Sequence, residues 1–234
     1  MIHHDVVQGT EAWLQLRAGI PTASQFHKII TPKTRKLSSQ AEDYLYKLVA
    51  ERALGRYLEE TRKFYWAERG KQEEDNARAF YEAMRNVDTT VCGFFTNDEG
   101  TIGASPDRLV GEDGLLEIKC PAPETHMGYL LGEPVTADYW LQIQGQLWIT
   151  ERDWTDVVSY HPDLGGTVIR VNRSLEDIAM LEEQIGHHFL VRLEAMLEAF
   201  RVRQGGEAKE LRVTDEGEDY TCAYSPSGMK YDER

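Results

Sequence analysis

Apolar residues recur along this chain with two different periods, which separate predicted helices from predicted strands. Spacing of three and four residues is typical of helices with one buried face. It predicts helices at residues 11–17, 22–30, 38–54, 66–86, 137–150 and 174–204, the last being the longest. Alternating segments predict strands at 89–96, 115–120, 154–160 and 167–171, and a turn at 97–100 leads into a further strand that ends near Asp107.

A β-hairpin is predicted where this last strand meets the segment 115–120. Its turn is Gly111-Glu-Asp-Gly114, an Asp-Gly pair between two apolar runs. Because side chains alternate along a strand, Leu116 and Ile118 share one face after the turn, and Glu117 and Lys119 share the other. We expect the first face to be core and the second to carry chemistry.

Asp107 lies before the turn and can approach Glu117 across the ladder. Two neighbouring carboxylates repel by several kcal/mol at an effective dielectric of about 20, unless a cation lies between them. Hard oxygen ligands favour Mg²⁺ or Mn²⁺. Lys119 would then hold or activate a water that attacks a phosphate. The alternative is an exposed hairpin with solvated charges, and the hairpin alone leaves both interpretations open.

Composition indicates a globular protein of one large domain. The chain has 234 residues, of which 41% are hydrophobic and 28% are charged. No apolar run approaches the length of a membrane span, and the first residues do not resemble a signal peptide, so we expect a cytoplasmic location. The three cysteines, Cys92, Cys120 and Cys222, have the spacing of neither a disulfide framework nor a metal cluster.

The net charge of −14 argues mildly against a nucleic-acid partner, but its distribution does not. One acidic residue accompanies five basic ones between Glu11 and Gln40. The basic residues are Arg17, Lys28, Lys33, Arg35 and Lys36. A local basic patch inside an acidic protein would allow one groove to bind a phosphate backbone while non-specific binding stays weak.

Arg17 and Ser24 flank the turn Gly19-Ile-Pro21 between the first two predicted helices. An arginine and a hydroxyl near a helix N-terminus can form a phosphate pocket. An exposed arginine beside a second capping serine is the alternative, and spacing alone favours that alternative.

Two further helices carry polar residues at their buried edges. Glu74 lies one turn before the apolar stripe of the helix 66–86, where its carboxylate needs a partner. A metal shared with Asp107 and Glu117 would serve, and so would a salt bridge to Arg78. On the helix 137–150, Gln142 and Gln146 share a face that either touches the site or nucleic acid, or is solvated surface.

The sequence changes character after Gly206. Residues 207–234 carry eight acidic and four basic side chains with little periodicity. We therefore predict a domain at 1–206 and an acidic tail at 207–234 that is mobile or binds a partner.

Four motifs resemble the phage lambda exonuclease, or YqaJ-type viral recombinase, family of PD-(D/E)XK nucleases. They are Trp13–Ser24, Gly70–Arg78, Ser105-Pro-Asp107 with Glu117-Ile-Lys-Cys-Pro121, and Tyr139–Trp148. Their order and approximate spacing match from about Trp13 to Gln204. The resemblance implies an α/β fold with a restriction-endonuclease-like core, in which a central mixed β-sheet is flanked by helices and followed by a long C-terminal helix.

The resemblance also implies roles for individual residues. Glu74, Asp107 and Glu117 would be metal ligands, helped by the backbone carbonyl of Ile118, and Lys119 would position or activate the water. Arg17 and Ser24 would bind the 5′-phosphate of the DNA end, and Gln142 would lie beside the metal site. Two Mg²⁺ ions about 3.5–4 Å apart would clamp the attacking and leaving oxygens, with Mn²⁺ as a substitute.

The activity implied is a Mg²⁺-dependent 5′→3′ exonuclease on linear double-stranded DNA that releases 5′-mononucleotides and leaves a 3′ single strand. The resemblance further implies a ring-shaped homotrimer that cooperates with a single-strand annealing protein in recombination. Two alternatives remain: a sequence- or structure-specific endonuclease on the same fold, and a non-catalytic adaptor that binds DNA ends. Intact Asp107, Glu117 and Lys119 argue against the adaptor.

Overall fold

The centre of the molecule is a mixed five-stranded sheet. The structure, a computed structural model, describes residues 1–58 and 64–205, and the side chains of 64–72 are outside the description. The strand order is β2-β5-β6-β7-β8, in which only β6 and β7 run parallel. The strands are β2 (Thr89–Val91), β5 (Arg108–Val110), β6 (Gly114–Lys119), β7 (Trp154–His161) and β8 (Gly165–Asn172).

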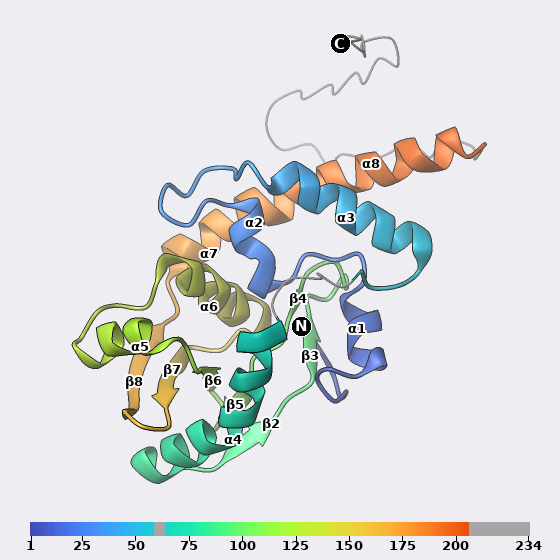
Figure 1. The fold of residues 1–234 in the computed structure, drawn as a ribbon. Helices are drawn as coiled ribbons and strands as arrows, with labels where there is room; N and C mark the ends of the chain where they lie inside the picture. The colour runs from blue at the N-terminus through green and yellow to red at the C-terminus, as the bar shows by residue number, and fades with distance from the viewer. Residues whose placement is uncertain (59–63, 206–234) are drawn as a thin grey trace.

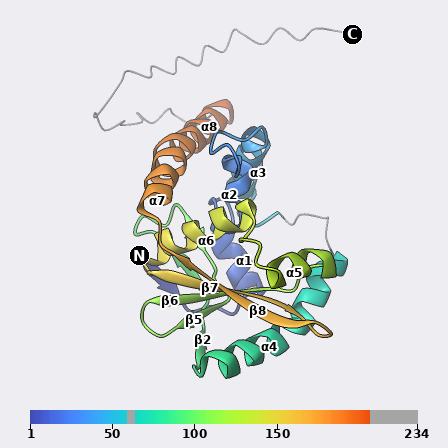
Figure 2. The same ribbon diagram turned by 90° about the vertical axis from the view of Figure 1, so that its left-hand side faces the viewer.

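Helices cover both faces of this sheet, α4 (Phe64–Arg85) on one side and α6 (Ala137–Thr150) on the other (Figure 2). Leu116 and Ile118 of β6 belong to the apolar cluster beneath α4, and Leu115 belongs to the cluster beneath α6. Both faces of β6 are therefore core. The expectation that only one face is buried was wrong, because helices pack on each side of the sheet.

A smaller sheet lies beside the first. It has the order β1-β3-β4 and consists of β1 (Ile2–His4), β3 (Phe94–Thr96) and β4 (Gly103–Ala104). The single strand predicted at 89–96 is thus two strands, β2 and β3, in different sheets. Gly93 separates them, and a Cβ there would lie 2.3 Å from the carbonyl oxygen of His4, so the chain bends where only glycine fits.

The N-terminal helices agree with the hydrophobic periodicity, with one exception. They are α1 (Glu11–Arg17), a 3₁₀ turn (Ala23–Gln25), α2 (Phe26–Ile29) and α3 (Ala41–Leu54), which ends at Gly55 in the left-handed region. The predicted helix 22–30 is therefore a 3₁₀ turn followed by one short α-helix. Thr22 occupies the N-cap position, but its side chain makes no capping hydrogen bond.

The C-terminal helix is long, as predicted, and packs beside α3 (Figure 1). Ser174 caps it by accepting a hydrogen bond from the backbone N–H of Asp177. It consists of α7 (Leu175–Leu181), a π-helical segment (Glu182–Phe189) and α8 (Leu190–Arg203). The acidic tail predicted at 207–234 lies outside the described residues.

Between β6 and α6 the structure contains a helix that the sequence did not predict. This helix, α5 (Pro123–Leu130), begins with proline at its first turn, where the missing N–H costs no hydrogen bond. The pair Pro121 and Pro123 therefore ends β6 and also starts a helix. Among the described residues, no helix is long and apolar enough to cross a membrane.

Candidate active site

The hairpin brings Asp107 and Glu117 to adjacent places. The β5–β6 ladder pairs Val110 with Gly114 and ends at Arg108 opposite Leu116. One step further along this register, Asp107 faces Glu117. The Asp107 carboxylate accepts a hydrogen bond of 2.6 Å from the backbone N–H of Ile118, which fixes its position at the end of the ladder.

Glu117 is 2% exposed and accepts hydrogen bonds on both oxygens. Lys119 Nζ and Gln142 Nε2 each lie 2.6 Å from Oε1, and Gln146 Nε2 lies 2.7 Å from Oε2. The two glutamines are four residues apart on α6, so they present their amides to the same carboxylate. Three donors from β6 and α6 therefore orient Glu117.

Asp107 lies in a strongly acidic environment. Burial raises the pKa of Asp107 well above its usual value, and the Glu117 carboxylate raises it further. Lys119 and the N–H of Ile118 act in the opposite direction, while Glu74 adds to the repulsion. Glu74 is therefore close enough to Asp107 for a Coulomb interaction, although the two residues come from α4 and the hairpin.

Lys119 lies on the Glu117 face of β6, the face from which Gln142 and Gln146 of α6 reach Glu117. Burial disfavours its charge, but Glu117 and Asp107 outweigh burial and raise the pKa of Lys119 above its usual value. Its ammonium nitrogen is also 4.7 Å from the centroid of the Tyr139 ring, a cation–π distance. The ammonium is thus held beside both carboxylates.

Glu74 does not form the alternative salt bridge considered from its sequence position. Arg78 binds Glu82 at 2.8 Å and Asp75 at 3.5 Å instead. Glu74 is half-buried on α4, and its charge helps to raise the pKa of Asp107.

The donor set fits a hard divalent cation in chemistry. Asp107, Glu117 and Glu74 supply carboxylate oxygens. Repulsion from the other two carboxylates helps to raise the pKa of Asp107, and a bound cation would relieve that repulsion. Within the part of the chain that the structure describes, no three His, Cys, Asp or Glu side chains are gathered closely enough to hold an ion as they stand. Glu117 accepts three hydrogen bonds, which leaves about one of its four lone-pair sites for a cation.

Arg17 and Ser24 also come together. Arg17 is only 7% exposed, so the alternative of an exposed arginine was wrong. One of its terminal nitrogens lies 3.4 Å from the hydroxyls of both Thr22 and Ser24. Its guanidinium carbon lies 4.2 Å from the Trp13 ring centroid. A cation with two hydroxyls beside it is a suitable anion site.

Hydrogen bonds connect this pocket to the loop that carries Asp107. Trp13 Nε1 donates to Ser105 Oγ at 2.8 Å, and Ser105 Oγ donates to the Gly93 carbonyl at 2.7 Å. Gln8 Nε2 donates to the carbonyl of Pro106, directly before Asp107, at 2.7 Å. Trp13 of the pocket is therefore hydrogen-bonded to the same loop that carries Asp107.

Sequence reasoning did not single out Gln146 as a hydrogen-bond donor to Glu117. Its spacing of four from Gln142 was the available signal, but a solvated face explained that spacing equally well. The structure decides the matter, because Gln146 is 1% exposed and contacts Glu117.

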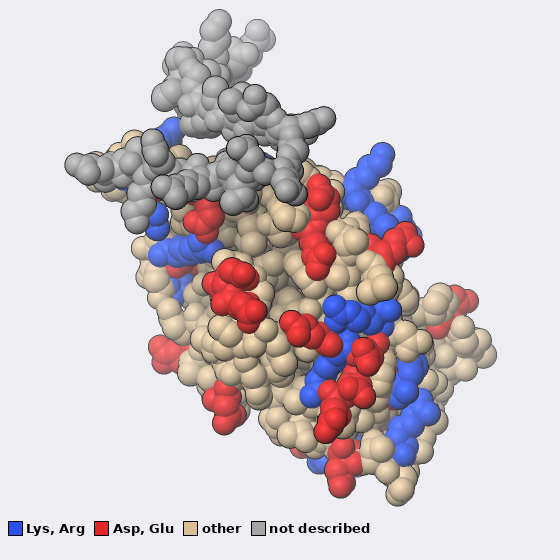
Figure 3. Space-filling view, turned by 180° about the vertical axis from the view of Figure 1, so that it is seen from behind, with Lys and Arg blue, Asp and Glu red and all other residues tan. Residues whose placement is uncertain are grey.

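The basic segment 11–40 is only partly a free surface. Arg17 is buried, and Arg35 pairs with Asp177 at 2.8 Å and Glu176 at 3.2 Å. Acidic and basic side chains are intermixed on the face shown in Figure 3. Lys33 and Lys36 are exposed on the loop between α2 and α3.

Among the solved structures similar to this one are two exonucleases, one of them solved twice. The alkaline exonuclease of Laribacter hongkongensis has 30% sequence identity and a TM-score of 0.75, covering 84% of this chain and 98% of its own. Its complex with dAMP gives 31% identity with the same TM-score and coverage. A phage-related exonuclease from Haemophilus somnus 129PT has 16% identity, a TM-score of 0.60 and coverage of 76% and 96%, and at this identity it shows the fold alone.

No curated protein sequence matches the chain significantly. The relatives of known structure support a nuclease, and specifically an exonuclease, as the enzyme class. Residues 12–153, more than half of the sequence, match the YqaJ-like viral recombinase domain. This chain therefore belongs to the YqaJ-like viral recombinase domain family.

Proposed function

We propose that this protein is a Mg²⁺-dependent 5′→3′ exonuclease that degrades linear double-stranded DNA to 5′-mononucleotides and leaves a 3′ single strand. The observation that carries the proposal is the convergence of Asp107, Glu117 and Lys119 at the end of the hairpin. The relative from Laribacter hongkongensis forms a complex with dAMP, a mononucleotide of the class that this reaction releases.

In this proposal Glu74, Asp107, Glu117 and the carbonyl of Ile118 hold the metal. Bound Mg²⁺, as one or two ions with Mn²⁺ as a substitute, would neutralise charge on the phosphate undergoing hydrolysis. Lys119 holds the attacking water by donating a hydrogen bond from its ammonium group. Gln142 and Gln146 keep Glu117 in one orientation, so that its oxygens do not turn away from the site.

The pocket of Arg17 and Ser24 gives the proposed direction of digestion. A terminal 5′-phosphate bound there is held by a charged donor and two hydroxyls, with the Trp13–Ser105 contact fixing the pocket relative to Asp107. The first phosphodiester bond of that strand would then be presented to the carboxylates. We extend the proposal to a homotrimeric ring and a single-strand annealing partner, which the family resemblance supports.

The test is digestion of a 5′-phosphorylated linear duplex labelled separately at its 5′ and 3′ ends, beside closed circular DNA, with Mg²⁺ or EDTA. We expect early, Mg²⁺-dependent release of the 5′ label as mononucleotide, with the circle intact. Lys119→Ala should lower the rate by about 10²–10⁴-fold while the thermal melt stays that of a folded protein.

Other results would assign a different function. Cutting of the circle would identify an endonuclease, and early loss of the 3′ label would reverse the direction. Binding of DNA ends without cleavage under any divalent cation would identify a non-catalytic adaptor. An active Lys119→Ala enzyme would contradict the role given to that side chain.

A further inference from the structure

The two side chains of the proposed phosphate pocket come from different elements. Arg17 is the last residue of α1, and Ser24 lies in the 3₁₀ turn that follows. Their separation of 3.4 Å therefore depends on the turn between them. Gly19 is the pivot of that turn, with φ of +75°, a conformation that favours glycine.

Two consecutive residues of α3 bind Gly19 from both sides. Its N–H donates to Glu51 Oε2 at 2.7 Å, and its carbonyl accepts from Arg52 Nε at 2.7 Å. A Cβ on Gly19 would lie 2.2 Å from Arg52 Cγ, so the side chain is in close contact with the turn. Two successive peptide groups are thus held by one acidic and one basic side chain.

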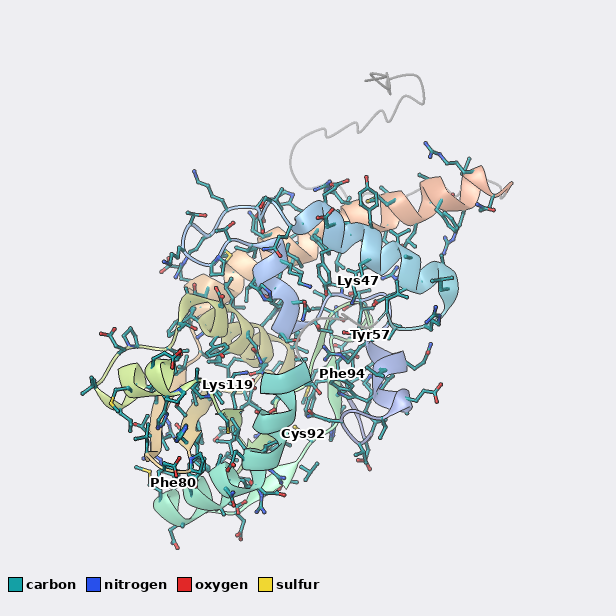
Figure 4. The ribbon with its side chains drawn as sticks, viewed as in Figure 1. Lys47, Tyr57, Phe80, Cys92, Phe94 and Lys119 are labelled. Carbon is teal, nitrogen blue, oxygen red and sulfur yellow. The ribbon has the colours of Figure 1, made fainter. Side chains whose placement is uncertain are left out.

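Glu51 is completely buried, and both of its carboxylate oxygens accept hydrogen bonds from backbone N–H groups. Oε1 accepts from the backbone N–H of Leu58 at 2.9 Å and lies 2.9 Å from Lys47 Nζ. Lys47 also lies 4.4 Å from the Tyr57 ring centroid, and Figure 4 shows both residues in the region between α3 and α1. A buried carboxylate needs such partners, and these partners fix its position.

The other end of the turn is tied to the loop of the active site. The Pro21 carbonyl accepts a hydrogen bond of 3.0 Å from Gly103 N–H, and Thr22 forms a β-bridge with Gly103. Gly103 is followed by Ser105 and Asp107. The turn is therefore clamped between α3 and the strand that leads to the carboxylates.

We propose that Glu51 and Arg52 are positioning residues that set the geometry of the 5′-phosphate pocket through Gly19, without contacting DNA themselves. The inference rests on the proposed function of Arg17 and Ser24 as that pocket. It assigns to α3 a part in choosing phosphorylated over hydroxyl ends, which a purely structural helix would not have.

The test compares KM and kcat on otherwise identical duplexes with 5′-phosphate or 5′-hydroxyl ends. Glu51→Gln keeps the shape but replaces one acceptor oxygen by a donor, so at least one backbone N–H loses its partner. We expect KM for the phosphorylated duplex to rise about tenfold, the effect of losing one charge-assisted hydrogen bond, with kcat and the hydroxyl-end reaction little changed. Glu42→Gln, on the same helix and paired with Arg192, is the matched control and should behave as wild type.

A second pair of variants keeps the test informative if Glu51→Gln does not fold. Arg52→Met removes the bond to the Gly19 carbonyl, whereas Glu194→Gln only neutralises the outer partner of Arg52 on α8. We expect Arg52→Met to raise KM on phosphorylated ends selectively and Glu194→Gln to leave it unchanged. If folded Glu51→Gln and Arg52→Met both retain the wild-type preference, the positioning role is overturned. If wild type itself lacks a preference for phosphorylated ends, the phosphate pocket is wrong, and the inference fails with it.

Discussion

At the scale of single residues, the best-defined feature is the set of donors around Glu117. Lys119 is on the same strand, whereas Gln142 and Gln146 reach the carboxylate from α6. Gln146 is the buried member, and its amide is the donor to Oε2. Removing one partner of a buried carboxylate costs more than the hydrogen bond alone, because the remaining group stays desolvated.

We predict that Gln146→Leu destabilises the protein by about 1–3 kcal/mol and also lowers nuclease activity, because Glu117 loses a donor and its orientation. Urea unfolding gives the stability, and end-labelled digestion gives the rate per folded molecule. The matched control is Gln144→Leu on the same helix. Gln144 is equally buried but binds the Asn172 carbonyl and the Ser174 N–H.

Gln144→Leu should lose comparable stability and keep the rate per folded molecule. Equal rates in the two folded variants would show that Gln146 has no part in orienting Glu117.

The sequence predicted which residues come together at the proposed site, but not how they are held. Asp107, Glu117 and Lys119 follow from strand alternation and the Asp-Gly turn, both of which are local properties. The burial of Arg17 and Gln146 depends on how α1, α3 and α6 pack together, and no local pattern contains that information. The ion pairs of Arg78 could not be predicted either. Three acidic residues lie three or four positions away on the helix, and the structure shows that Asp75 and Glu82 are the partners.

At the scale of elements, the hydrophobic periodicity located every described helix except α5. That helix was missed because Pro121 and Pro123 are usual signals for the end of a structure, and proline in the first turn of a helix looks the same in sequence. The predicted strand 89–96 was wrong for a related reason. Its apolar pattern continues through Cys92 and Gly93, and only the close approach of β1 shows that the chain changes sheets there.

The packing of α5 on β7 gives a prediction about pH. His126 of α5 is fully buried, and its Nδ1 lies 2.7 Å from Ser159 Oγ. Its ring is stacked 6.1 Å from that of His161, which has Asp163 3.9 Å away. Burial, with a smaller contribution from His161, lowers the pKa of His126 below its usual value of 6.5.

Because the folded state binds this proton less readily than the unfolded state, the neutral imidazole contributes stability above pH 6.5 that is lost as the pH falls through the lowered pKa. We predict a smaller loss of stability on acidification for His126→Asn than for wild type, measured by urea unfolding between pH 7.5 and about 5. His187→Asn, at an exposed site on the C-terminal helix, should keep the wild-type dependence. An unchanged slope in His126→Asn would remove His126 as the source.

At the scale of the whole molecule, the proposed function requires an acidic protein to bind a polyanion. The net charge of −14 includes a net −4 from residues 207–234, where eight acidic side chains face four basic ones. Fewer basic side chains are free to bind phosphate on the surface than the sequence suggests, because Arg35 is paired with Asp177 and Arg17 is buried in its pocket. Binding must therefore depend on a few well-placed cations, and non-specific attraction to the surface is weak.

This distribution predicts a dependence on salt that differs between DNA ends. Each phosphate contact displaces counterions and contributes about −0.9 to the slope of log K against log salt concentration for a duplex. We predict that Arg17→Met lowers the magnitude of that slope by about one on 5′-phosphorylated duplex, because one phosphate loses its cation. On 5′-hydroxyl duplex the slope should stay that of wild type.

The measurement is fluorescence anisotropy of labelled duplexes in EDTA, which prevents cleavage, across a series of salt concentrations. A salt-independent affinity in the wild-type protein would contradict binding through phosphate contacts. An equal change of slope on both kinds of end would place Arg17 on the duplex backbone, away from the terminal phosphate. Only a change confined to phosphorylated ends fits a pocket in which a buried arginine, two hydroxyls and a clamped turn select the chemistry of the end.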